Sequence, residues 1–272
     1  MGRQMAAERP DTRAAVASPM AQAAPASGLE TTTDQFLGGR LNLQQPRDGY
    51  RAAIDPVLLA ATLAVPAGGR IADLGCGVGT AGLCALLRLP GVACIGIDIQ
   101  GPLISLATIN AAANGLADRY QTRHGSILAK SVLADLGTID QVIVNPPYLP
   151  QGEASISADP IKALANVESD ARLADWVAAG ARIVRPGGAV TFIHRADRLP
   201  ELLALMRERL GSLVVLPIQP KAGDEAHRVI VQGRKDKRAP ARLLAPLVLH
   251  ELDGSYTAAA QHLLRDAGAL EL

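Results

Sequence analysis

The chain has 272 residues, of which 49% are hydrophobic and 19% charged, and its formal net charge is +1. This length suits one large domain or two small ones, and a charge so near zero does not by itself indicate a nucleic-acid-binding protein. The sequence contains no uncharged apolar run of about 18 residues, which excludes a membrane span.

Cysteine and histidine usage argues against metal sites and disulfides. Cys76, Cys84 and Cys94 are odd in number and contain no C-x-x-C pair, so neither a disulfide framework nor a zinc knuckle is expected. The five histidines show no metal-ligand spacing. Reduced cysteines are typical of the cytoplasm, where we expect the protein to act. We also expect it to be a monomer.

The first thirty residues are rich in Ala, Ser, Pro and Arg and show no sustained apolar period. We interpret residues 1–33 as a disordered tail. They lack the continuous apolar stretch of roughly 7–15 residues that a secretory signal needs. An organellar transit peptide or a misassigned start codon would have the same composition. The folded domain is expected to cover residues 34–272.

The predicted elements begin with a hairpin at 34–46, which turns at Gly38 and Gly39. A helix follows, with Asp55 as its N-cap and Pro56 at its first helical position. Strands and helices then alternate. Strands are expected at 70–74, 92–99, 120–125, 139–144, 189–194, 212–218 and 227–233, and helices at 80–89, 102–115, 170–184 and 198–210. A helical turn at 131–135 and a further strand at 246–250 complete the prediction.

This alternation predicts an α/β fold, namely a Rossmann-like, doubly wound sheet of seven mostly parallel strands with a short N-terminal hairpin. The link between residues 218 and 227 is shorter than the roughly twelve residues that a parallel connection needs. The last of the seven strands, at 227–233, is therefore expected to run antiparallel to its neighbours.

The turn DLGCGVGT joins the strand at 70–74 to the next helix. Its three glycines permit a tight turn and close approach of the backbone to a ligand: Gly75, Gly77 and Gly79. Asp98 ends the next strand, where an acid typically accepts from ribose hydroxyls. Thr80 stands where a dinucleotide fingerprint has its third glycine, and Asp73 would repel a pyrophosphate. A cationic nucleoside such as S-adenosylmethionine suits this loop better.

The stretch VIVNPPYLP places polar groups directly after a buried strand, at the strand end where open α/β sheets bind ligands. The Asn145 side chain and the Pro146 backbone each offer a carbonyl that accepts from an exocyclic amine, and Pro147 holds the turn rigid. Tyr148 offers a face on which a flat base stacks, worth about 1–3 kcal/mol. This combination indicates a methyl-acceptor site, because strand termination alone would require one proline.

ADLGCGVGT, GIDI and NPPY resemble class I S-adenosylmethionine-dependent methyltransferases of the N-P-P-Y group. FLGGRLNLQQPRDGYRAAIDPVLLAA and PLVLHELDGSYTAAAQHLLR are similar to the bacterial valine-tRNA adenine-N6 methyltransferase family, whose substrate is the adenine 3′ of the anticodon. The resemblance covers roughly residues 34–260. It implies S-adenosylmethionine as cofactor and tRNA as partner.

The resemblance also implies roles for single residues. Asp73 and the three glycines would hold the methionine end of the cofactor, and Arg51 would meet its carboxylate. Asp98 would bind the ribose, with Ile99 beside it in the same site, and Asn145 would contact the cofactor as well as the methyl acceptor. Relatives often carry an acid after the third strand, but this chain has Ser126 there, which accepts more weakly and predicts lower cofactor affinity.

The segment 221–242 is distinctly basic and flanks the predicted strand RVIVQG. Such a segment suits contact with the phosphates of tRNA. It equally suits a solvated hairpin whose lysines guard an edge strand. The sequence leaves both interpretations open.

The N-P-P-Y motif specifies the reaction more strongly than the substrate. The leading hypothesis is a tRNA adenine-N6 methyltransferase; the alternatives are a release-factor glutamine N5-methyltransferase and a methyltransferase of another RNA amino group. Glutamine enzymes usually carry a helical domain before the cofactor fold, and a tail and hairpin stand here instead. A non-catalytic RNA-binding module would need a damaged motif, and the glycine spacing disfavours a nicotinamide dehydrogenase.

Overall fold

A computed structural model describes residues 29–48, 51–147 and 171–272. The chain begins with an antiparallel hairpin of β1 (Thr31–Phe36) and β2 (Leu41–Pro46), joined by the short 3-10 helix η1 (Leu37–Gly39). Gly38 and Gly39 have φ of 66° and 89°, as the turn requires. The predicted hairpin is confirmed, but it starts at Thr31, inside the segment expected to be a tail.

The main sheet contains the seven predicted strands in the order β8-β9-β7-β6-β3-β4-β5. Their bounds are β3 (Arg70–Leu74), β4 (Ala93–Asp98), β5 (Tyr120–His124), β6 (Ile139–Val144), β7 (Val184–Arg195), β8 (Gly211–Lys221) and β9 (Arg228–Arg234). The strands β3 to β7 pair in parallel, whereas β9 pairs antiparallel with both β7 and β8. The antiparallel strand expected from the short link is confirmed.

Two short strands extend this sheet to nine. β10 (Arg242–Leu243) and β11 (Leu247–His250) both pair in parallel with β8. The strand expected at 246–250 is therefore present, and β10 is additional. Because β10 and β11 pair with β8, β9 is an internal strand and needs no guard against edge pairing, whereas Arg242 of the basic segment lies on the edge strand β10.

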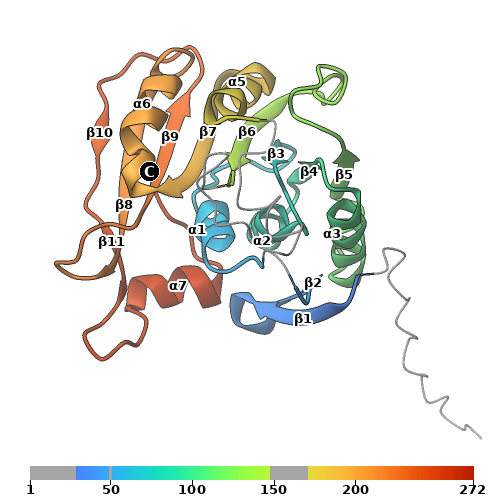
Figure 1. The fold of residues 1–272 in the computed structure, drawn as a ribbon, viewed down its shortest axis with the longest axis horizontal. Helices are drawn as coiled ribbons and strands as arrows, with labels where there is room; N and C mark the ends of the chain where they lie inside the picture. The colour runs from blue at the N-terminus through green and yellow to red at the C-terminus, as the bar shows by residue number, and fades with distance from the viewer. Residues whose placement is uncertain (1–28, 49–50, 148–170) are drawn as a thin grey trace, which may run out of the picture.

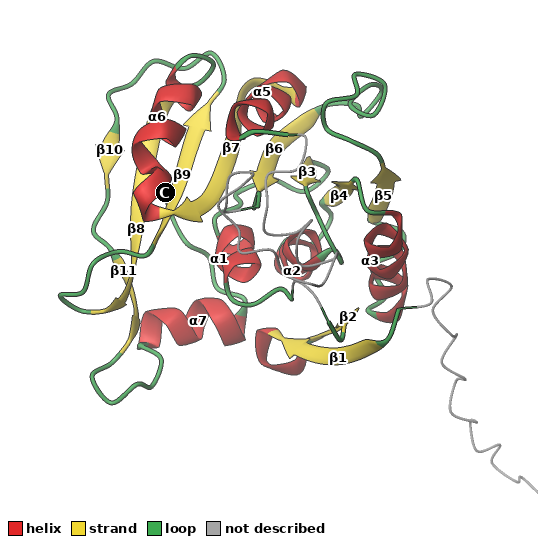
Figure 2. Cartoon of the chain, viewed as in Figure 1, coloured by secondary structure: helices red, strands yellow, loops and turns green. Residues whose placement is uncertain are grey.

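Helices cover both faces of the main sheet, as a doubly wound fold requires. They are α1 (Asp55–Ala61), α2 (Thr80–Arg88), α3 (Gly101–Ala113), α5 (Leu173–Ile183), α6 (Leu199–Arg207) and α7 (Ala258–Asp266). One hydrophobic core packs α1, α2, α3 and α7 against side chains such as Ile71 and Ile143. The other packs α5 and α6 against Ala72 and Val142, and Figure 2 shows these two helices beside β6 to β9. Successive residues of β3 and β6 thus face opposite cores.

The structure corrects two local predictions and adds one helix. The N-cap of α1 is Ile54, and Asp55 is the first helical residue, where its carboxylate accepts from Arg228 Nε at 2.6 Å. Residues 131–135 form turns without a helix. Helix α7 was not predicted; Thr257 caps it by accepting from the Ala260 amide at 3.1 Å.

Cys76, Cys84 and Cys94 are buried free thiols. Within the described ranges no helix is long and apolar enough to cross a membrane. The same part of the chain holds no cluster of three or more His, Cys, Asp or Glu side chains that suits a metal ion.

Candidate functional site

A cleft of about 470 Å³, including its mouth, opens where β3 and β6 end. The β1–β2 hairpin, α1, α2 and α3 also contribute to its walls. The lining residues are Gln45, Ala52, Pro56, Asp73, Gly75, Cys76, Gly77, Val78, Thr80, Ala81, Leu103 and Asn145. The cleft thus joins the glycine turn to the residue that opens N-P-P-Y, as their positions at strand ends predict.

The glycine turn is held by backbone contacts and by its own geometry. Gly75, Gly77 and Gly79 have φ of 73°, 54° and 89°, which side chains other than glycine rarely adopt. A Cβ at Gly75 would lie 2.9 Å from the ring of Trp176, whereas one at Gly77 would meet nothing within 4 Å. The turn therefore packs on α5 at one glycine and stays open at the next.

Asp73 is buried at the base of the cleft with only 2% of its surface exposed. Its Oδ2 accepts from the Gly82 amide at 3.0 Å, near the start of α2. Burial raises the pKa of Asp73 from 3.8 to about 7, although the bond from Gly82 opposes this shift. A cation bound beside Asp73 would lower this pKa and favour the charged carboxylate.

Asp98 lies under the glycine turn and is not among the residues that line the cleft. Its two carboxylate oxygens accept from the amides of Gly77 and Gln100, both at 2.8 Å. Burial raises the pKa of Asp98, and these amide bonds lower it. Asp98 therefore links the end of β4 to the turn, while the neighbouring Ile99 is 47% exposed.

Ser126 follows β5, at the same end of the parallel strands as Asp98. Its hydroxyl accepts from the Leu128 amide at 3.2 Å, and the preceding Gly125 donates to the Asp98 carbonyl at 2.8 Å. The hydroxyl thus shapes a turn beside Asp98 and does not line the cleft.

Asn145 follows the last residue of β6 and lines the cleft. Pro146 is buried and Pro147 partly buried. Tyr148 lies outside the described residues, so its stacking role stays a prediction. The described part of N-P-P-Y thus begins at the cleft that the glycine turn also lines.

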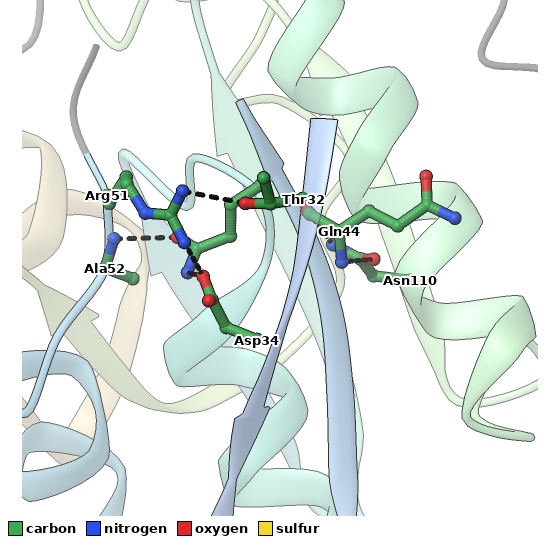
Figure 3. A network of polar contacts seen from close by, with 7 residues as sticks. Thr32, Asp34, Gln44, Arg51, Ala52 and Asn110 are labelled. Atoms are coloured by element: carbon green, nitrogen blue, oxygen red, sulfur yellow. Dashed lines mark hydrogen bonds and ion pairs between the residues drawn. The ribbon is translucent and has the colours of Figure 1, made fainter. Parts of the chain in front are cut away.

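Arg51 belongs to a polar network between the hairpin and the segment before α1 (Figure 3). Its guanidinium donates to Thr32 Oγ1 at 2.7 Å and forms an ion pair with Asp34. Gln45 donates to the same Asp34 carboxylate at 2.6 Å and accepts from the Ala52 amide at 2.8 Å. Gln45 and Ala52 line the cleft, whereas Arg51 does not.

Residue-by-residue reading of the sequence missed Thr80 and Gln45. The Thr80 hydroxyl is buried at the cleft and has no hydrogen-bond partner among the described residues. Its signal was available, since Thr80 replaces the third glycine of a dinucleotide fingerprint. Gln45 lines the cleft only because the hairpin packs over the cleft, and no local sequence pattern predicts that contact.

Comparisons with known proteins agree with this geometry. The family model of the methyltransferase small domain matches residues 53–196, which include the glycine turn and N-P-P-Y. The crystal structure of a predicted O-methyltransferase from Agrobacterium tumefaciens superimposes with a TM-score of 0.67 at 26% identity, over 80% of this chain and 99% of that one.

Curated relatives act on different substrates. A release factor glutamine methyltransferase of Chlorobaculum tepidum is 27% identical, and the match covers 54% of this chain and 52% of that protein. A tRNA1(Val) (adenine(37)-N6)-methyltransferase of Dickeya chrysanthemi is 26% identical over 81% of this chain and 88% of that protein. The chain thus spans about half the length of the first relative. It belongs to the methyltransferase small domain family.

Proposed function

We propose that this protein transfers a methyl group from S-adenosylmethionine to the exocyclic N6 of an adenine in tRNA, next to the anticodon of valine tRNA. The observation that carries the reaction type is the position of Asn145 in one cleft with Asp73 and the glycine turn. The extent of the match to the Dickeya chrysanthemi tRNA enzyme supports the substrate, because it covers most of both chains.

The residues of the cleft fit the cofactor. The buried Thr80 hydroxyl is available to a polar ligand group, and Gly77 leaves its surface open for close approach. Asp73 would hold the ammonium of the methionine end, and Asp98 and Ile99 would border the nucleoside end. Arg51 would act indirectly, because it pairs with the Asp34 carboxylate that also holds Gln45 at the cleft. Ser126 would act by shaping the turn beside Asp98. The cofactor supplies an activated methyl group on a sulfonium.

Catalysis would rest on how Asn145 and Pro146 orient the acceptor. The lone pair of an adenine amine is delocalised into its ring, so the amine is a weak nucleophile. The Asn145 side-chain carbonyl and the Pro146 backbone carbonyl would accept hydrogen bonds from its two N–H groups and concentrate electron density on nitrogen, and the amine would lose one proton to solvent after methyl transfer. Pro147 fixes the turn and Tyr148 would stack on the base. Alignment of nitrogen and methyl group supplies the remaining acceleration.

An adenine in an unpaired loop suits this arrangement. A base must leave its stack before a protein can enclose its amino group, and a loop base costs less to extrude than a paired one. The planar amide of a glutamine would satisfy the same acceptors. The shorter match to the release factor enzyme makes this the second candidate.

The deciding experiment measures methyl transfer from labelled S-adenosylmethionine to unmodified total tRNA and to a release factor. N6-methyladenosine in digested tRNA is the expected product, and Asn145→Ala should lower kcat by about 10²–10³-fold. Cofactor titration of the variant serves as the control that the glycine turn remains intact. Methylglutamine in the release factor, with tRNA unmodified, would refute the proposed substrate.

A further inference from the structure

A groove of about 1740 Å³, including its open mouth, lies between the end of α6 and the segment that joins β9 to β10. The Ser212 hydroxyl accepts from the Ala239 amide at 3.0 Å, which ties that segment to the beginning of β8. A Cβ at Gly211 would lie only 1.8 Å from the Lys237 carbonyl oxygen, so the two backbones are in close contact. The groove is therefore bordered by two backbone segments that pack directly against each other.

The walls of the groove carry an excess of positive charge. Four exposed cations line it, Arg207, Arg209, Lys237 and Arg238, against the two acids Glu208 and Asp236. None of the four cations forms an ion pair within the described part of the chain. Such unpaired guanidinium and ammonium groups favour a polyanionic partner.

The groove and the cleft lie at opposite ends of the sheet strands. Arg234, beside the groove, pairs with Ala189 in the early part of β7, whereas Asn145 follows the end of β6. In Figure 1 the arrowheads of β6 and β9 accordingly point in opposite directions. Strand rise and spacing put the groove roughly 20 Å from Asn145. The basic segment 221–242 therefore does not form one surface. Lys221 and Arg228 lie at the end of the sheet where the cleft opens, whereas Lys237 and Arg238 lie in the groove at the other end.

We infer that this basic groove binds the phosphodiester backbone of a folded RNA at a site remote from the methylated base. The inference rests on the proposed RNA substrate and adds a second contact to it. A separation of roughly 20 Å is too large for one extruded base to bridge, but the paired arm that carries a loop extends that far. The groove contacts phosphates and carries no information about base sequence.

The test compares Arg207→Gln and Arg238→Gln with the matched control Arg265→Gln, an exposed arginine on α7. Fluorescence anisotropy measures binding of a labelled, unmodified valine tRNA transcript at several salt concentrations. Each groove variant should weaken binding about three- to tenfold and reduce the slope of log K against log salt by about 1. Cofactor affinity should be unchanged in all three variants.

Equal effects of the groove and control variants on binding and salt slope would overturn the inference, as would a wild-type protein that binds no tRNA. Failure of the proposed function is distinguishable, since binding is measured without turnover. If methyl transfer goes to a protein glutamine while tRNA binding still depends on Arg207 and Arg238, the groove stands and the substrate assignment falls.

Discussion

At the scale of single residues, the charge of Asp73 depends on pH close to neutrality, because its pKa is raised to about 7 by burial. If the carboxylate holds the cofactor ammonium, affinity should rise with pH through this value, by up to about tenfold per unit below it. Isothermal titration of S-adenosylmethionine between pH 6 and pH 8 measures this rise. Asp73→Asn should bind weakly with a flat profile, and a variant that keeps the pH dependence would exclude Asp73 as its source.

The same carboxyl should make the unliganded fold less stable as the pH rises. The folded pKa of about 7 exceeds the reference value of 3.8, so the native state binds more protons than the unfolded state between these values. The contribution of Asp73 to the free energy of unfolding therefore falls from about pH 4 to pH 7 and stays low above it. Urea unfolding at pH 5 and pH 8 should show Asp73→Asn gaining stability relative to wild type at the higher pH. An equal difference at both pH values would contradict this.

The sequence alone predicted those cleft residues whose positions follow from the parallel arrangement of the strands. Asp73 lies near the end of β3, and the glycine turn and Asn145 follow the ends of β3 and β6. Parallel neighbours bring such ends to one edge of the sheet. The contacts of Arg51 and Gln45 depend instead on how a hairpin docks across the sheet. No periodicity encodes that docking, so the engagement of Arg51 by Asp34 and Thr32 needed the structure.

At the scale of elements, two asparagines, one in α3 and one at its C-cap, hold the outer edge of the hairpin. Asn110 exchanges hydrogen bonds with the backbone of Gln44, and Asn114 does so with Asn42, at 2.8–3.0 Å. Four helical residues rise about 6 Å and two strand residues about 6.6 Å, so the pairs stay in register. Asn110 also donates to the Val78 carbonyl at 3.0 Å, in the glycine turn.

This asymmetry predicts different effects for two similar substitutions. Asn110→Ala frees the turn as well as the hairpin and should weaken cofactor binding about tenfold, whereas Asn114→Ala should change it less than about twofold. Buried backbone groups left without partners should also cost Asn110→Ala about 1–3 kcal/mol of stability. Cofactor titration well below both melting temperatures measures the difference. Equal losses of affinity would mean that only hairpin docking matters.

Elements were predictable where their patterns were long and apolar. The runs that became β3, β4, β6 and β7 are rich in buried apolar residues, and α5 places Trp176 and Val177 in the core. Helix α7 buries only Ala260, Leu263 and Leu264 and is otherwise polar, so its period is weak. The two-residue strand β10 exists only through its pairing with β8.

At the scale of the whole molecule, the hairpin is part of the folded body. Helix α7 contacts η1 and β11 and so joins the hairpin to the far edge of the sheet, as Figure 1 shows. Leu29, before β1, packs against Val78 and Leu103 beside the cleft. We therefore propose that the folded domain begins at or before Leu29, earlier than the tail composition suggested.

Two shortened chains test this boundary. A chain beginning at Leu29 should match the full chain in melting temperature and cofactor affinity, because it keeps β1 and the Thr32 contact with Arg51. A chain beginning at Asp34 loses that contact, the packing of Leu29 and half of β1. It should melt several degrees lower, since about 1 kcal/mol shifts Tm by about 2–4 °C in a domain of this size. Its cofactor affinity should also fall, because Asp34 and Gln45 lose part of the strand that positions them. Thermal melts with and without S-adenosylmethionine measure both effects.

If the two shortened chains behave alike, the first half of β1 contributes nothing to the cleft. If the Leu29 chain already binds more weakly than the full chain, residues 1–28 have a role that their composition does not indicate.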